Sequence, residues 1–263
     1  MVTLDDILGL SEQQMLGFVL TFVRITALMS IAPIFGSQTV PMQVKVFLSL
    51  FLAMVLLPVL KTDVNIKSLS LVGMLPLTLK EVVVGLFLGF NAKFMFESFQ
   101  FAGHLVSTQM GLGMASLIDP DSGTQATPIG NIYSMTAIMF FLMMNGHHMV
   151  ISALYRSFEV FSVGSMSLIK PAAGPHMLTL FNDLFAVGIR LAAPCMATLF
   201  LIEVCMGIMA RMVPQMNIFF IGLPLRLGVG MFIIIASLPV FYVFFSSLLE
   251  AWKRDINGIL TYF

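Results

Sequence analysis

The sequence predicts an all-α protein of the membrane type, with about six long apolar helices. Hydrophobic residues make up 59% of the chain, charged residues only 10%, and the mean hydropathy is +1.00. Soluble domains usually carry about 25% charged residues, so this chain has too few to cover a surface in water. Its apolar runs are also apolar on every side, whereas the strands of a membrane β-barrel alternate polar and apolar residues.

Six segments are candidates for membrane-spanning helices, each of which needs about 20 mostly apolar residues. They are 15–35, 44–60, 71–90, part of 122–155, 178–212 and 227–249. Ionisable side chains inside such segments are costly in hydrocarbon and usually face protein or water. The intramembrane charges singled out here are Arg24, Asp183, Arg190 and Glu203. Arg190 follows Asp183 by seven residues on the same helical face and is its expected partner.

A polar stripe follows the third segment, which continues without a proline past residue 100. Its members recur at spacings of three and four residues, which places them on one helical face. They are Lys93, Glu97, Gln100, His104 and Ser107. Two interpretations are open. Lys93 and Glu97 can form an ordinary solvated pair, or the stripe can line an aqueous path or contact a neighbouring subunit.

The segment 109–128 interrupts the helical pattern with several glycines and with Pro120 and Pro128. Non-helical backbone between membrane helices is tolerated inside protein or against a water-filled cavity. A loop of small residues that carries Met110 and Met114 could therefore close a passage. An ordinary solvent-exposed connector has the same composition, and composition alone favours the connector.

The sequence predicts no enzyme, no cofactor and no metal site. It contains no phosphate-binding loop of the G-x-x-x-x-G-K-[ST] form. Asp119 opens a calcium-like loop, but the twelfth position is Gly130, where a bidentate Glu is needed. His147 and His148 are adjacent, so on a helix they point about 100° apart and cannot chelate as an i,i+4 pair does.

Several short motifs occur in a fixed order along the chain. They are Arg24, Ala32-Pro-Ile-Phe-Gly36, Pro41 with Lys45, Gln109-Met-Gly-Leu-Gly-Met-Ala115 with Asp119-Pro120, Asn145-Gly-His147, and Pro214-Gln-Met-Asn-Ile-Phe-Phe-Ile-Gly-Leu-Pro-Leu-Arg-Leu-Gly228. In this order and spacing, over about residues 15–255, the chain resembles the FliR family, flagellar biosynthetic proteins of the bacterial type III secretion export gate. Each motif is weak alone, and their order carries the resemblance.

The resemblance implies a division of the chain into two parts. Residues 1–176 would form a FliP-like helical part, and 177–263 a FliQ-like helical hairpin. The hairpin turn would contain Pro214, Gln215, Asn217 and Pro224.

The resemblance also implies a function. Such proteins assemble with several copies of FliP and FliQ into a channel through which unfolded flagellar subunits cross the inner membrane, with FlhB and FlhA as further partners. Part of the assembly is raised toward the periplasm, and no nucleic acid is involved. An injectisome export-gate homologue is one alternative. A secondary transporter is another, but the glycine-rich break at 111–123 has no counterpart in the second half, as inverted repeats would require.

The family has a plug loop inside its channel, and this loop maps onto residues 110–120 here. The residues concerned are Met110, Gly111, Leu112, Gly113, Met114, Ala115, Ser116, Leu117, Ile118, Asp119 and Pro120. The resemblance thus reverses the preference for a simple connector. We expect Met114, Leu117 and Ile118 to help seal the closed gate against ions.

Two arguments about membrane orientation conflict. With six spans, the side that holds the N-terminus carries Lys61, Lys67, Arg156, Lys170, Lys253 and Arg254, and the opposite side carries Lys45, Lys93, Arg211 and Arg226. The positive-inside rule would call the first side cytoplasmic. The resemblance instead puts the 214–224 turn at the cytoplasmic end. We follow the resemblance because the difference in charge is small.

Deletion of residues 110–120 tests the plug assignment. We expect the deletion to raise ion leakage across the membrane, because it removes the apolar residues that would seal the closed gate. The measurement is membrane potential and proton influx in cells that coexpress the gate proteins, with the intact chain as control. Unchanged leakage would exclude a sealing role for this segment.

Overall fold

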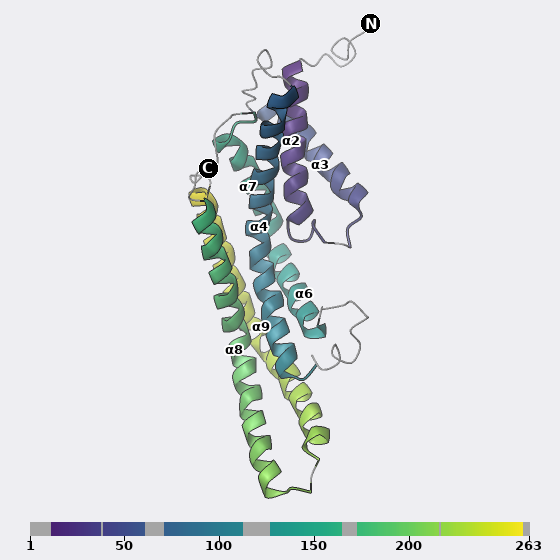
Figure 1. The fold of residues 1–263 in the computed structure, drawn as a ribbon, viewed down its shortest axis with the longest axis vertical. Coiled ribbons are helices and arrows are strands. Elements are labelled where there is room, and N and C mark those ends of the chain that lie inside the picture. Colours follow the sequence, from purple (N-terminus) through teal and green to yellow (C-terminus); the bar gives the residue numbers. More distant parts are fainter. Residues whose placement is uncertain are drawn as a thin grey trace. The chain divides into compact units, whose positions relative to one another are not determined.

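The computed structural model describes residues 12–37, 39–60, 71–112, 127–164, 173–215 and 217–259. The helices, in chain order, are α2 (Glu12–Ile31), α3 (Met42–Leu56), the 3-10 turn η1 (Leu57–Val59), α4 (Leu71–Gln109), α6 (Pro128–Met143), α7 (Gly146–Val160), α8 (Ala173–Met212) and α9 (Ile218–Ile259) (Figure 1). Across these ranges, extended structure is limited to a single bridge residue, Val163. The all-α prediction is confirmed.

The number of candidate membrane helices also agrees with the sequence. Five helices in the described part of the chain are long and apolar enough to cross a membrane. The sixth candidate is α6 together with α7, which are bent by 70° at the break between them. The single span predicted within 122–155 is therefore two helices. Asn145 adopts the left-handed conformation with φ 56°, which Asn tolerates better than most residues, and this separates α6 from α7.

The turn between α2 and α3 is built from the first sequence motif. Pro33 follows the end of α2, and the Gly36 N–H donates to the Ala32 carbonyl at 2.7 Å. A Cβ at Gly36 would lie 2.8 Å from the Ser30 carbonyl oxygen, so only glycine fits there. Lys45 Nζ donates to the Ser37 carbonyl at 2.9 Å, which ties α3 back to the turn.

Helix α4 is a continuous helix of 39 residues, longer than the predicted 71–90 span. It ends in a Schellman motif, in which the Gly111 N–H donates to the Thr108 carbonyl and the Leu112 N–H to the Ser107 carbonyl, both at 3.1 Å. Gly111 has φ 84°, a conformation that strains residues with a side chain. The backbone of Gly111 therefore fixes where the helix stops.

The described helices belong to two compact units. The first contains Met1–Lys93, Asn145–Leu178 and Ala251–Phe263, and the second contains Phe94–Met144 and Thr179–Glu250. Helix α4 contributes its first part to one unit and its last part to the other. The division into FliP-like and FliQ-like parts stays a prediction.

In the first unit, α2 packs closely against α4 at two glycines. A Cβ on Gly85 would lie 2.4 Å from the Arg24 carbonyl oxygen, and one on Gly89 would lie 3.0 Å from the Leu28 carbonyl oxygen. Both glycines are thus needed for the two backbones to approach this closely. Around this contact Ile25, Leu28 and other side chains of α2 are almost fully buried.

The second unit has an aromatic core. Phe99 of α4 is fully buried and makes edge contacts with Phe241 and Phe245 of α9, with ring centroids 6.3 and 5.4 Å apart. Tyr133 of α6 packs against Phe241 at 4.9 Å. Large aromatic side chains bury much apolar area and prefer these edge geometries. They hold α4, α6 and α9 together.

Helices α8 and α9 form a hairpin, as Figure 1 shows. Residues 213–217 connect them, so Pro214, Gln215 and Asn217 lie in or next to the turn as predicted. Pro224 does not, because α9 begins at Ile218 and includes it. A proline removes one i→i−4 hydrogen bond, and apolar membrane-type helices tolerate that loss when their surroundings compensate.

Substituting alanine for Gly85 tests the close contact of α2 with α4. We expect it to lower the free energy of unfolding by about 1–3 kcal/mol, because the new methyl group would clash with the backbone of α2. Gly207→Ala is the matched control, since a Cβ there meets nothing within 4 Å, and it should be neutral or stabilising. Thermal midpoints in detergent measure both, and equal midpoints would contradict the packing described.

Candidate functional site

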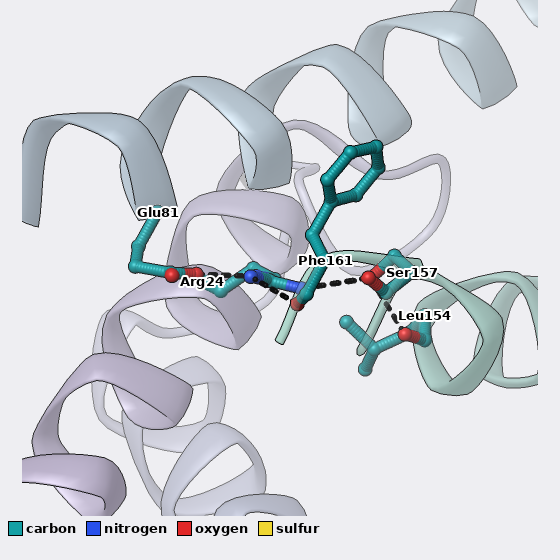
Figure 2. Close-up of polar contacts among 5 residues, drawn as sticks. All are labelled: Arg24, Glu81, Leu154, Ser157 and Phe161. Carbon is teal, nitrogen blue, oxygen red and sulfur yellow. Dashed lines mark hydrogen bonds and ion pairs between the residues drawn. The ribbon is translucent and has the colours of Figure 1, made fainter. Parts of the chain in front are cut away.

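A buried ion pair joins Arg24 of α2 to Glu81 of α4, and both side chains are fully buried (Figure 2). Arg24 Nε donates to Glu81 Oε2. The same guanidinium reaches α7, where Nη1 donates to the Ser157 carbonyl at 3.0 Å and Nη2 to the Phe161 carbonyl at 3.2 Å. Phe161 is the C-cap of α7, and the Ser157 carbonyl also accepts the Phe161 N–H at 3.0 Å, so Arg24 binds the last turn of this helix. One arginine thus ties together three helices of the first unit.

The environment of this pair is apolar and compact. The Arg24 guanidinium carbon lies 4.3 Å from the centre of the Phe158 ring. The Ser157 hydroxyl donates to the Leu154 carbonyl at 2.7 Å (Figure 2). Glu81 Oε1 is buried and has no hydrogen-bond partner within the described ranges. Desolvation of such a pair offsets much of its attraction, so its main effect is a large penalty when one partner is removed.

Sequence reasoning identified Arg24 as an intramembrane charge but did not find its partner. The signal was present, because Glu81 is an acidic residue in the middle of another apolar segment. Opposite charges within apolar spans usually pair with one another. The other acceptors of Arg24 are two backbone carbonyls and the Ser157 hydroxyl, whose oxygen lies 3.4 Å from Nη1, and no pattern of charges in the sequence indicates them.

A second ion pair crosses the hairpin. Arg226 Nη2 of α9 lies 3.2 Å from Glu203 Oε1 of α8, with the two side chains 27% and 50% exposed, respectively. Glu203 was predicted as an intramembrane charge without a partner. Its contact with Arg226 stabilises the hairpin only modestly because both groups are partly exposed.

The expected pairing of Asp183 with Arg190 is wrong. Both residues are exposed on α8, and no ion pair between them occurs among the described residues. Seven residues correspond to about 10.5 Å along a helix, so the two side chains share a face but do not meet. Helix α8 therefore presents two separate charges of opposite sign on its exposed surface.

The structure places most of the predicted polar stripe on the outside of α4. Lys93, Gln100 and His104 are exposed and Glu97 is partly exposed. Ser107 is fully buried, so its assignment to the stripe is wrong. Thr108, one residue later, is exposed and continues the face, because a spacing of four residues returns to nearly the same side of a helix.

Three residues of the predicted plug segment lie in the described part of the chain. Met110 is fully buried and packs on α9 at Gly230, where a Cβ would lie 2.8 Å from Met110 Cε. The Cys195 thiol of α8 lies 4.0 Å from the Gly230 carbonyl oxygen. Gly111 and Leu112 form the Schellman motif. The other predicted residues of the plug, 113–120, lie outside the described residues.

The sequence of the chain matches a family model, "Bacterial export proteins, family 1", over residues 15–252. The chain belongs to this family. It is 34% identical to the flagellar biosynthetic protein FliR of Bacillus subtilis (strain 168) over 254 residues, which cover 92% of this chain and 94% of that protein.

Two further relatives carry the same name. FliR of Escherichia coli (strain K12) is 34% identical over 222 residues, which cover 83% of this chain and 82% of the relative. FliR of Aquifex aeolicus (strain VF5) is 26% identical over 238 residues, which cover 90% and 91% of the two chains. The family inferred from the order of the motifs is confirmed. Its members are flagellar biosynthesis and export proteins, which fits a chain of membrane-type helices.

Removal of one partner tests the buried ion pair. Arg24→Met should lower the free energy of unfolding by about 3–5 kcal/mol, because Glu81 is left buried without a counter-charge. The double variant Arg24→Met/Glu81→Leu should recover much of this loss. Arg226→Met should cost no more than about 1 kcal/mol, since its partner is half exposed.

Thermal unfolding of the purified variants in detergent measures all three changes. Equal losses for Arg24→Met and Arg226→Met, or no recovery in the double variant, would contradict the assignment of a fully desolvated pair.

Proposed function

We propose that the chain is a structural component of the flagellar type III export gate. In this role it forms, with FliP and FliQ, the channel through which unfolded flagellar subunits cross the inner membrane. Its similarity over nearly its whole length to proteins named flagellar biosynthetic protein FliR supports this proposal. No step of this function requires the chain to act as an enzyme or to bind a cofactor.

The structural observation that carries the proposal is the exposed charge on α8. Asp183 and Arg190 are exposed within Met177–Met212, a segment long and apolar enough to cross a membrane. Charged side chains within membrane-spanning segments seldom face lipid and usually lie against protein or water. A face with separate charges of both signs suits the polar surface of a neighbouring subunit.

The proposal includes an arrangement of the chain within the gate. Residues 1–176 act as a FliP-like part and 177–263 as a FliQ-like hairpin, with part of the assembly raised toward the periplasm. The hairpin of α8 and α9, with its Glu203–Arg226 contact, supports the second assignment. FlhB and FlhA are further partners in this proposal.

The proposal also assigns a plug to residues 110–120. The buried side chain of Met110 and the Schellman motif at Gly111 give this segment a fixed starting point on α4 and α9. A short plug needs a fixed base, because ordering an unanchored segment in the closed channel would cost conformational entropy.

Coexpression of the tagged chain with FliP and FliQ of the same organism tests the proposed assembly. We expect native mass spectrometry in mild detergent to show a stable hetero-oligomer that contains one copy of this chain. Arg190→Glu should lower the yield of the complex, since it reverses a charge on the proposed contact face. Lys253→Glu, near the end of α9, should not.

A lone monomer or homodimer, despite good expression of all three proteins, would overturn the proposal. Equal yields for Arg190→Glu and the wild type would remove α8 from the contact while leaving the assembly intact.

A further inference from the structure

One face of α4 in the second unit is polar over about two turns. Gln100, His104 and Thr108 follow one another at intervals of four residues, and all three are exposed. They lie within Gly73–Gln109, a segment long and apolar enough to cross a membrane. Polar side chains that lack partners are unfavourable in hydrocarbon. This face therefore contacts water or polar protein groups.

The face carries groups that can form hydrogen bonds in several ways. The Gln100 amide both donates and accepts hydrogen bonds, and the His104 ring has two nitrogens that can take part in them. The Thr108 hydroxyl donates to the His104 carbonyl at 2.9 Å, so its oxygen is left to accept. Asp and Glu, Lys and Arg are absent from these three positions, although Glu97, one turn earlier on the stripe, is partly exposed.

Such a face suits the backbone of an extended polypeptide better than the surface of a folded helix. An extended chain offers one unsatisfied N–H and one unsatisfied C=O per residue, whatever its sequence. A helix satisfies these groups internally and would present only its side chains. The face from Gln100 to Thr108 is about 12 Å long, the length of about four residues of extended chain.

The position of the face agrees with this chemistry. It ends at Thr108, whose carbonyl accepts the Gly111 N–H at 3.1 Å in the motif that ends α4. Met110, the first residue of the proposed plug, lies between Thr108 and Gly111 along the chain. A polypeptide that follows the face would thus arrive at the base of the proposed plug.

We propose that Gln100, His104 and Thr108 form a hydrogen-bonding surface for the backbone of a polypeptide in transit. This inference rests on the proposed role in the export gate and assigns the polar face of α4 to the passage of substrate. It decides between the two uses of the stripe, conduction and subunit contact, in favour of conduction.

Site-specific photocrosslinking in the full complex tests the inference. The photoreactive residue p-benzoylphenylalanine replaces Gln100 or His104, and an export substrate fused to a stably folded domain is arrested in transit. We expect crosslinks to the substrate from both positions, and none from Leu201, an exposed residue of α8. Crosslinks only to a partner subunit, or equal crosslinking from Leu201, would overturn the inference.

Apolar variants give an independent measure. Gln100→Leu/His104→Leu should lower export by about tenfold, the effect of losing about two ordinary hydrogen bonds, with the yield of the complex unchanged. Thr108→Val should lower export, whereas Thr136→Val on α6 should not, although its hydroxyl also donates to a carbonyl one turn earlier, that of Ile132, at 2.8 Å.

The outcomes separate this inference from the proposed function. Unchanged export in an intact complex would refute the role of the polar face alone. Failure of the double variant to assemble would point to a subunit contact. The crosslinks from Gln100 and His104 in the otherwise unaltered chain then decide whether these positions contact the substrate or a subunit. Failure of the wild-type chain to assemble with FliP and FliQ would instead refute the proposed function.

Discussion

The first unit depends on the neutralisation of one buried arginine. A guanidinium at zero exposure is tolerable only when its donors are satisfied and its charge is balanced. Glu81 supplies the charge, and the end of α7 supplies two carbonyls. This requirement fixes the rotation of α2 and the position of α4, because a shift of either would leave charge buried without a partner. The two glycines of α4 make the arrangement possible by letting the backbone of α2 come within reach.

The second unit is organised by a different principle. Its core is aromatic, its helices approach at glycines, and the charged residues of its hairpin lie at or near the surface. Gly103 of α4, for example, faces Gly130 of α6, where an added Cβ would lie 2.7 Å from the Gly130 Cα. Aromatic and glycine contacts hold the interior of this unit, and the polar side chains discussed above face outward. Asp183 and Arg190 are exposed charges on α8, whereas the outer side of α4 in this unit carries Glu97 followed by Gln100, His104 and Thr108.

Helix α4 combines both principles in one element. Its first half carries Glu81 and the two glycines that receive α2, and its second half carries Phe99 on one side and the polar face on another. An uninterrupted helix can hold such different faces because side chains four residues apart share a side while those between them point elsewhere. Its stop at Gly111 then sets the start of the proposed plug.

The sequence by itself determined the helical class, the number of apolar segments and the family, since these follow from composition, run length and the order of motifs. It also located Arg24, Glu203 and most of the polar stripe, because charge in an apolar run is visible without a structure. Only the tertiary structure showed that Arg24 meets Glu81 and that Glu203 meets Arg226, since such contacts join residues far apart in the chain. It likewise decided that Ser107 turns inward and that Pro224 belongs to α9. Helical spacing fixes a side chain's direction only to within a fraction of a turn, and neighbouring helices determine which sides are buried.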